Sequence, residues 1–136
     1  MFAAMVDREQ VTDWVSRYEQ AWQTPGTELL KDLFTDDATY RVTPYDDPVS
    51  GLEAIAVMWD EERDGPDEVF TMTSDVVAVE DDNAVVRVEV AYGDPVAQEY
   101  RDLWVIRFDP DGRCGSFEEW PFWPQHGRSP SARATG

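Results

Sequence analysis

An alternating run from Tyr100 to Phe108 constrains the fold of this chain more than any other feature. Successive side chains of a β-strand point to opposite faces, so a strand here has one apolar face and one face rich in arginine. Asp102 falls on the apolar face, together with Tyr100, Trp104, Ile106 and Phe108. Burial among aromatic side chains removes the hydration of a carboxylate and raises its pKa. The run therefore predicts a strand that carries a candidate acid–base group.

A tight turn follows this strand and returns the chain beside it. The segment Asp109-Pro110-Asp111-Gly112 has proline where a turn fixes φ and glycine where φ becomes positive. The second strand of this hairpin, Cys114 to Phe122, contains Glu118 and Glu119. A shift of one residue exchanges the two faces of a strand. We favour Glu119 over Glu118 for the interior, with the opposite register as the alternative.

The N-terminal half has the apolar spacing of helices. Asp7 and Gln10 form a predicted capping box for a first helix that ends at Thr24-Pro25-Gly26. Thr27 is the predicted cap of a second helix, which ends at Asp36-Asp37, and a short strand follows from Ala38 to Thr43. A third helix is predicted from the pair Ser50 and Glu53 to Gly65-Pro66.

The second half is predicted to be four strands: Val69 to Val79, Ala84 to Tyr92, Gln98 to Phe108 and Cys114 to Phe122. Helices first and a meander last predict an α+β fold, in which a curved antiparallel sheet packs against three N-terminal helices and encloses a pocket. We expect one domain over residues 1–124 and a disordered tail over residues 125–136, where apolar periodicity is absent.

Charge and cysteine content limit the partners of the chain. Asp and Glu number 29 against 11 Lys and Arg, for a formal net charge of -18. Such a field repels nucleic acid and anionic membranes, so neither is an expected partner. The single cysteine, Cys114, has no internal disulfide partner, and no long apolar run precedes the first charges. These features predict a cytoplasmic protein.

The order of these segments resembles the nuclear transport factor 2-like superfamily, in particular its SnoaL-like branch. The resemblance covers about residues 7 to 124 and rests on LFTDDATY (Leu33 to Tyr40), the helix led by Gly51, DLWVIRFDPDGR (Asp102 to Arg113) and FEEWPFWP (Phe117 to Pro124). It implies a cone-shaped sheet with a cavity, and a homodimer formed through the outer face of the sheet. It implies no single activity, because this fold hosts enzymes, carriers and association domains.

The resemblance implies a catalytic role for one residue of this chain, and it also shows that several catalytic residues of the relatives have no counterpart here. Tyr18 matches the tyrosine of ketosteroid isomerases that donates a hydrogen bond to an oxyanion. The aspartate base of those enzymes falls near Val42 here, and the Arg and Asp of limonene epoxide hydrolase-like enzymes fall at Val86 and Val88. Other relatives use histidine, and the single histidine here is His126 in the expected tail.

Three polar residues remain as catalytic candidates: Tyr18 as hydrogen-bond donor, Asp102 as general base and Glu119 as a second acid. The alternative is structural, with Asp102 paired to an arginine and Tyr18 packed in the core. Further residues are predicted to line a pocket for a small hydrophobic ligand: Trp14, Trp22, Tyr40, Val42, Met58, Trp59, Val88, Val90, Trp104 and Phe117. Trp120, Phe122 and Trp123 are predicted to cover a sheet edge or to meet a second subunit.

Three functions are compatible with these residues. The first is a cofactor-free isomerase, lyase or cyclase acting on a hydrophobic metabolite. The second is a noncatalytic ligand-binding or dimerisation domain, and the third is a protein-association module of the same fold. No cluster of histidine and cysteine predicts a metal site, and no glycine-rich loop predicts a phosphate cofactor.

Overall fold

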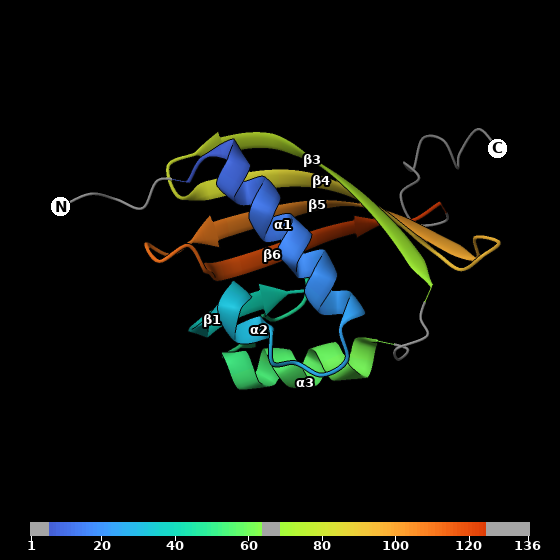
Figure 1. The fold of residues 1–136 in the computed structure, drawn as a ribbon, viewed down its shortest axis with the longest axis horizontal. Coiled ribbons are helices and arrows are strands. Elements are labelled where there is room, and N and C mark those ends of the chain that lie inside the picture. Colours follow the sequence, from blue (N-terminus) through green and yellow to red (C-terminus); the bar gives the residue numbers. More distant parts are fainter. Residues whose placement is uncertain (1–5, 64–68, 125–136) are drawn as a thin grey trace.

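The folded chain is a curved sheet with α1 lying across one face and α3 beside β1 (Figure 1). The computed structural model describes residues 6–63 and 69–124. The elements in chain order are α1 (Arg8–Gln23), α2 (Leu30–Leu33), β1 (Phe34–Arg41), β2 (Val49–Ser50), α3 (Leu52–Glu62), β3 (Phe70–Glu80), β4 (Asn83–Tyr92), β5 (Gln98–Phe108) and β6 (Cys114–Phe122). The predicted α+β fold is therefore confirmed, and the predicted tail lies outside the described residues.

The sheet is mixed and not wholly antiparallel as the sequence pattern predicted. Its strand order is β2-β1-β6-β5-β4-β3, and β3 to β6 form the expected antiparallel meander. β1 runs parallel to β6, with Tyr40 opposite Phe117. Apolar alternation indicates which face of a strand is buried, but the direction of a distant neighbour depends on the route of the chain between them. The short edge strand β2 pairs antiparallel with β1 and was not predicted.

Helix α1 fills the concave face of the sheet. It begins with the predicted capping box, in which Asp7 accepts from the Gln10 backbone and Gln10 accepts from the Asp7 backbone. Its buried face contains Val11, Trp14, Val15, Tyr18 and Ala21. The core is closed near the turn between β3 and β4, where the chain enters α1, and it opens toward the turn between β4 and β5. Polar side chains of the strands are thus brought together at the open end.

The second helix is shorter than predicted, and β1 begins where it ends. α2 stops at Leu33, and Thr27 accepts the Leu30 N–H through its backbone carbonyl rather than capping through its side chain. β1 begins at Phe34, not at the predicted Ala38. Phe34 and Ala38 are both fully buried, while a register irregularity between Phe34 and Thr39 leaves the intervening acids exposed. Because the irregularity interrupts the alternation of buried and exposed residues, the sequence pattern did not predict the first half of β1.

The predicted capping box of the third helix is also wrong. Ser50 belongs to β2 and pairs with Thr39, so its side chain does not cap α3. Gly51 occupies the cap position with φ 94°, and its N–H donates to the Ala38 carbonyl at 2.8 Å. Only glycine adopts this backbone conformation at little cost. The helix ends at Glu62, and the predicted end at Gly65-Pro66 lies outside the described residues.

Arg63 joins the end of α3 to the end of α1. Its guanidinium donates to the carbonyls of Thr24 and Gly26, each at 2.8 Å, and it lies about 6 Å from the centres of the Trp22 and Trp59 rings. Cations stabilise the C-terminal end of a helix, where carbonyls lack intrahelical donors. This contact fixes α3 against α1 at the open end of the sheet.

Candidate functional site

A cavity of about 580 Å³ occupies the open end of the sheet, between α1, α3 and the ends of the strands. Helices contribute Tyr18, Trp22, Met58 and Glu62 to its wall. The strands and the loops after β1 and β4 contribute the other lining residues, which are Tyr40, Val42, Phe70, Met72, Val90, Tyr92, Ala97, Gln98, Tyr100, Asp102, Trp104, Glu119 and Pro121. The wall is therefore mainly aromatic, with a few polar groups among the rings.

Strand alternation delivers two carboxyl groups to this cavity. On β5, Asp102 lies on the same face as Trp104 and is 7% exposed. On β6, Glu119 lies opposite Trp104 and points inward, while Glu118 lies opposite Val105 on the outer face. Glu118 pairs with Arg41 at 3.6 Å and accepts from Trp120 Nε1 at 2.6 Å. The register therefore places Glu119, and not Glu118, in the cavity.

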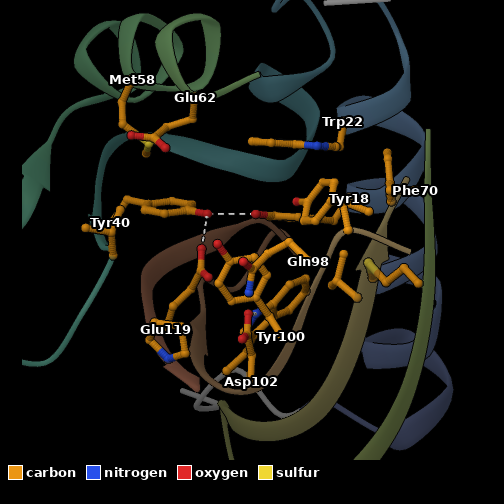
Figure 2. Close-up of a pocket in the computed structure, with 17 residues that line it drawn as sticks. Tyr18, Trp22, Tyr40, Met58, Glu62, Phe70, Gln98, Tyr100, Asp102 and Glu119 are labelled. Atoms are coloured by element: carbon orange, nitrogen blue, oxygen red, sulfur yellow. Dashed lines mark hydrogen bonds between the residues drawn. The ribbon is translucent and has the colours of Figure 1, made fainter. Parts of the chain in front are cut away.

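Tyr18, Tyr40 and Glu119 form a chain of hydrogen bonds along the cavity wall, and Asp102 lies below Glu119 (Figure 2). The hydroxyls of Tyr18 and Tyr40 lie 2.7 Å apart, and the Tyr40 hydroxyl donates to Glu119 Oε1 at 2.7 Å. The Asp102 carboxyl lies beside that of Glu119, where its charge acts on Glu119, and Trp104 Nε1 lies 3.4 Å from Asp102 Oδ2. Three elements, α1, β1 and β6, thus hold one hydrogen-bond chain, and β5 places a second carboxyl next to its end.

The two carboxyls hold a proton at neutral pH. Burial, and next the negative charge of Asp102, raises the pKa of Glu119 to about 8. Burial also raises the pKa of Asp102, although hydrogen bonds from Glu119 and Trp104 oppose that shift. Two neighbouring carboxyls in one buried site do not both ionise readily, so Glu119 keeps its proton beside the Asp102 carboxylate.

The two tyrosines stay protonated beside this pair. Burial, and next the charge of Glu119, raises the pKa of both Tyr18 and Tyr40 well above the usual value for tyrosine. The site therefore combines neutral phenols, a neutral carboxylic acid and an ionised carboxylate in a cavity of low polarity. Such a set accepts a proton at one group and supplies one at another.

The family model of the SnoaL-like domain matches residues 3–112, which is most of the chain. This chain belongs to the SnoaL-like domain family. The family predicted from the sequence is thereby confirmed.

Solved structures share this SnoaL-like fold at low sequence identity. The RV0760c protein of Mycobacterium tuberculosis aligns with a TM-score of 0.68 and 11% identity, over 87% of this chain and 98% of its own. A proposed SnoaL-like polyketide cyclase from Jannaschia sp. CCS1 aligns with a TM-score of 0.67 and 16% identity, over 85% of this chain and 90% of its own. A search of curated proteins found no match. At these identities the likeness establishes the fold alone.

The SnoaL-like cavity contains most, but not all, of the residues predicted for it. Tyr18, Asp102 and Glu119 line it together, and so do Trp22, Tyr40, Val42, Met58, Val90 and Trp104. Four predicted lining residues are core residues instead, each at most 1% exposed: Trp14, Trp59, Val88 and Phe117. They share a face with lining residues but lie deeper, where α1, α3 and the sheet meet and no space remains.

Lining residues missed by sequence reasoning continue the same periodicities outward. Phe70 and Met72 alternate on β3, Tyr100 shares the face of Asp102, and Glu62 lies one helical turn beyond Met58. Extending each apolar face to the end of its element would have identified these residues. Gln98 continues the face of Tyr100 and Asp102 to the start of β5, whereas Ala97 lies in the turn before it, where no period predicts the direction of a side chain.

Other groups of the SnoaL-like chain lie away from the cavity. Cys114 is fully buried, and burial raises the pKa of its thiol, so it stays an unreactive core residue. Within residues 6–63 and 69–124, no three acidic, histidine or cysteine side chains gather where a metal ion could bind. In the same residues, every helix is too short or too polar to span a membrane. His126 lies outside the described residues.

Proposed function

We propose that this protein binds a small hydrophobic metabolite in the cavity and transforms it by cofactor-free acid–base catalysis. The observation that carries this proposal is the hydrogen-bond chain from Tyr18 through Tyr40 to Glu119, with the buried Asp102 carboxyl beside Glu119 in the same cavity wall. Proton abstraction next to a carbonyl, as in isomerases, lyases and cyclases, needs a base and a hydrogen-bond donor in one apolar site. The polyketide cyclase name of the Jannaschia relative is consistent with this reaction class.

Asp102 would be the general base. Asp102 is ionised while Glu119 holds the shared proton. Its pKa is raised above that of an exposed aspartate, so it lies closer to the pKa of a carbon acid and makes Asp102 a stronger base. Asp102 would return the abstracted proton to another atom of the intermediate and so regain its charge, while Glu119 stays protonated beside it as the second acid. Tyr18 would rotate its hydroxyl from Tyr40 to the substrate oxygen, while Tyr40 continues to donate to Glu119.

Solvent deuterium exchange tests this chemistry without the natural substrate. We expect the protein to accelerate exchange at the α-carbon of 2-tetralone, an apolar ketone of suitable size, as followed by NMR in heavy water. Asp102→Asn should lower the catalysed rate about 10²- to 10⁴-fold, because a neutral amide does not accept the proton. The rate should also fall above pH about 8, where Glu119 loses its proton.

Glu118→Gln is the matched control for Glu119→Gln. The two variants replace adjacent glutamates and change the net charge by the same amount. Glu119 lines the cavity, whereas Glu118 faces outward. Exchange should be reduced in Glu119→Gln and unchanged in Glu118→Gln. Equal exchange in the wild type and Asp102→Asn would contradict the proposed base.

The outer face of the sheet supports a proposed homodimer. Leu103, Val105, Trp120 and Phe122 are each between 38% and 43% exposed, and β5 and β6 place them on the face opposite the cavity. Apolar side chains gathered on one face are typical of association surfaces. Light scattering at micromolar concentration should give the mass of a dimer for the wild type and of a monomer for Leu103→Arg. A wild-type monomer would contradict this assembly.

The location and the remaining partners stay predictions. The cytoplasmic location rests on the single cysteine, and the absence of nucleic-acid partners rests on the net charge of -18.

A further inference from the structure

All charged side chains that line the cavity are acidic. Glu62, Asp102 and Glu119 belong to its wall, and none of the lining residues in the described part of the chain is Lys, Arg or His. Arg63 follows Glu62, but its guanidinium is held by the carbonyls of Thr24 and Gly26 and by the Asp60 carboxylate at 2.9 Å. An anionic ligand would therefore meet no counter-ion in the cavity, and three carboxyls would repel it or lose hydration beside it.

The direction of the hydrogen bonds leaves acceptors facing the cavity. A hydroxyl has one hydrogen, so while Tyr40 donates to Glu119, Tyr18 donates to Tyr40 and turns its lone pairs toward the cavity, and it offers its hydrogen to a ligand only after rotating away from Tyr40. Asp102 Oδ1 is buried, and no N–H or hydroxyl group in the described residues donates to it. The buried Trp22 N–H is a lining donor without a partner in the described residues, but one neutral N–H does not balance the charge of a buried carboxylate.

Aromatic rings complete a site for a positive charge. The cavity wall contains the rings of Tyr18, Trp22, Tyr40, Phe70, Tyr92, Tyr100 and Trp104. In Figure 2, Glu62 on α3 lies on one side of the Tyr18 and Tyr40 side chains and Glu119 and Asp102 lie on the other, with Trp22 on the side of Glu62. The faces of aromatic rings attract cations, and nearby carboxylates strengthen that attraction.

We infer that the ligand of this cavity carries a protonated amine or quaternary ammonium group on an apolar body. The acidic lining, the outward lone pairs and the aromatic wall each favour this class over a neutral or anionic metabolite. The inference rests on the proposed function, because it names the substrate class of the same cavity. The cation would lie between Glu62 and the pair formed by Asp102 and Glu119.

Binding of a cation would release part of the proton that the pair holds. A positive charge beside Glu119 favours its ionised form, so the ionised fraction rises as the cation enters, and the remaining fraction keeps the proton that the proposed catalysis uses. The titratable groups that surround the pair are Tyr18 on α1, Tyr40 on β1, Glu62 on α3, Tyr92 on β4 and Tyr100 on β5. Tyr18 and Tyr40 stay protonated, because their pKa values are raised. Affinity should therefore increase as pH rises toward about 8, the pKa of Glu119.

Three probes of one shape but different charge test this inference: phenyltrimethylammonium, tert-butylbenzene and benzenesulfonate. Quenching of tryptophan fluorescence, or calorimetry, gives the affinity of each. We expect the cation to bind at least about tenfold more tightly than the neutral probe and the sulfonate not to bind. Proton release, measured by calorimetry in buffers of different ionisation enthalpy, should accompany binding of the cation alone.

Glu62→Gln and Glu61→Gln form a matched pair of variants. Both remove one charge from the same turn of α3, but only Glu62 lines the cavity. Glu62→Gln should weaken binding of phenyltrimethylammonium several-fold without changing that of tert-butylbenzene, and Glu61→Gln should change neither. Equal affinity for the cationic and neutral probes, preference for the sulfonate, or no binding of the cation would each overturn the inference. If the cation does not bind preferentially but the same preparation still catalyses deuterium exchange of 2-tetralone, only the inferred cationic ligand is wrong and the proposed catalysis stands. If exchange is absent as well, both proposals are contradicted.

Discussion

The free energy of unfolding is expected to fall as pH rises from about 5 to about 8.5, and Glu119→Gln should remove most of that fall. The pKa of Glu119 is about 8 in the folded protein and 4.5 in an ordinary environment. Between these values the folded chain keeps a proton that the unfolded chain has released, so rising pH favours the unfolded state. Each unit of pKa corresponds to about 1.4 kcal/mol, and water in the open cavity relieves part of the cost, so we expect a loss of about 2–3 kcal/mol.

Glutamine is the appropriate replacement because it imitates the protonated acid. Its carbonyl oxygen accepts from Tyr40, and its amide donates to Asp102, at any pH. Urea unfolding of the wild type and the variant across this pH range measures the difference directly. Glu118→Gln removes the same charge from the outer face and should follow the pH dependence of the wild type. A Glu119→Gln curve parallel to the wild-type curve would contradict the raised pKa.

The second large effect is expected at Trp14. Its side chain is 1% exposed and contacts the rings of Phe34 and Phe108 edge to face, with centroids 5.7 Å apart in each case. Its Nε1 donates to the Leu33 carbonyl at 3.0 Å, which fixes the end of α2. Trp14→Ala should lower the free energy of unfolding by about 3–5 kcal/mol, because it leaves a cavity where α1 meets the sheet.

Two other variants separate the causes of this loss. Trp14→Phe keeps a ring in the core but leaves the Leu33 carbonyl without its donor, so it should cost less than Trp14→Ala, about 1–3 kcal/mol. Tyr45→Ala changes a side chain that is 99% exposed and should alter stability by no more than about 0.5 kcal/mol. Chemical denaturation checks all three. Similar losses for Trp14→Ala and Tyr45→Ala would mean that Trp14 is not part of the core.

Sequence periodicity predicted the elements whose burial is regular. The four long strands lie within one residue of their predicted bounds, because turns with Asp, Asn, Gly and Pro separate clear alternations. The same alternation correctly predicted Asp102 on the buried face. β1 was predicted incompletely, because the irregularity after Phe34 interrupts its period, and Ser50 was assigned to a cap although it pairs in β2.

The depth of a residue within the cone was not predictable from periodicity. Trp14 and Tyr18 share one face of α1, yet Trp14 is core and Tyr18 lines the cavity one helical turn later. The contact between Tyr40 and Glu119 joins residues 79 positions apart and depends on the parallel pairing of β1 with β6. A local pattern contains no information on such a pairing, so the hydrogen-bond chain emerged only from the three-dimensional structure.

The central claim is that Glu119 and Asp102 share one proton at neutral pH. The most direct test is an NMR titration of the side-chain carboxyl carbons in ¹³C-labelled protein, with the Glu119 signal assigned by its loss in Glu119→Gln. The account predicts that the Glu119 carboxyl titrates near pH 8, well above the exposed glutamates. Titration of Glu119 near its ordinary value of 4.5, with Asp102 already ionised, would contradict the account.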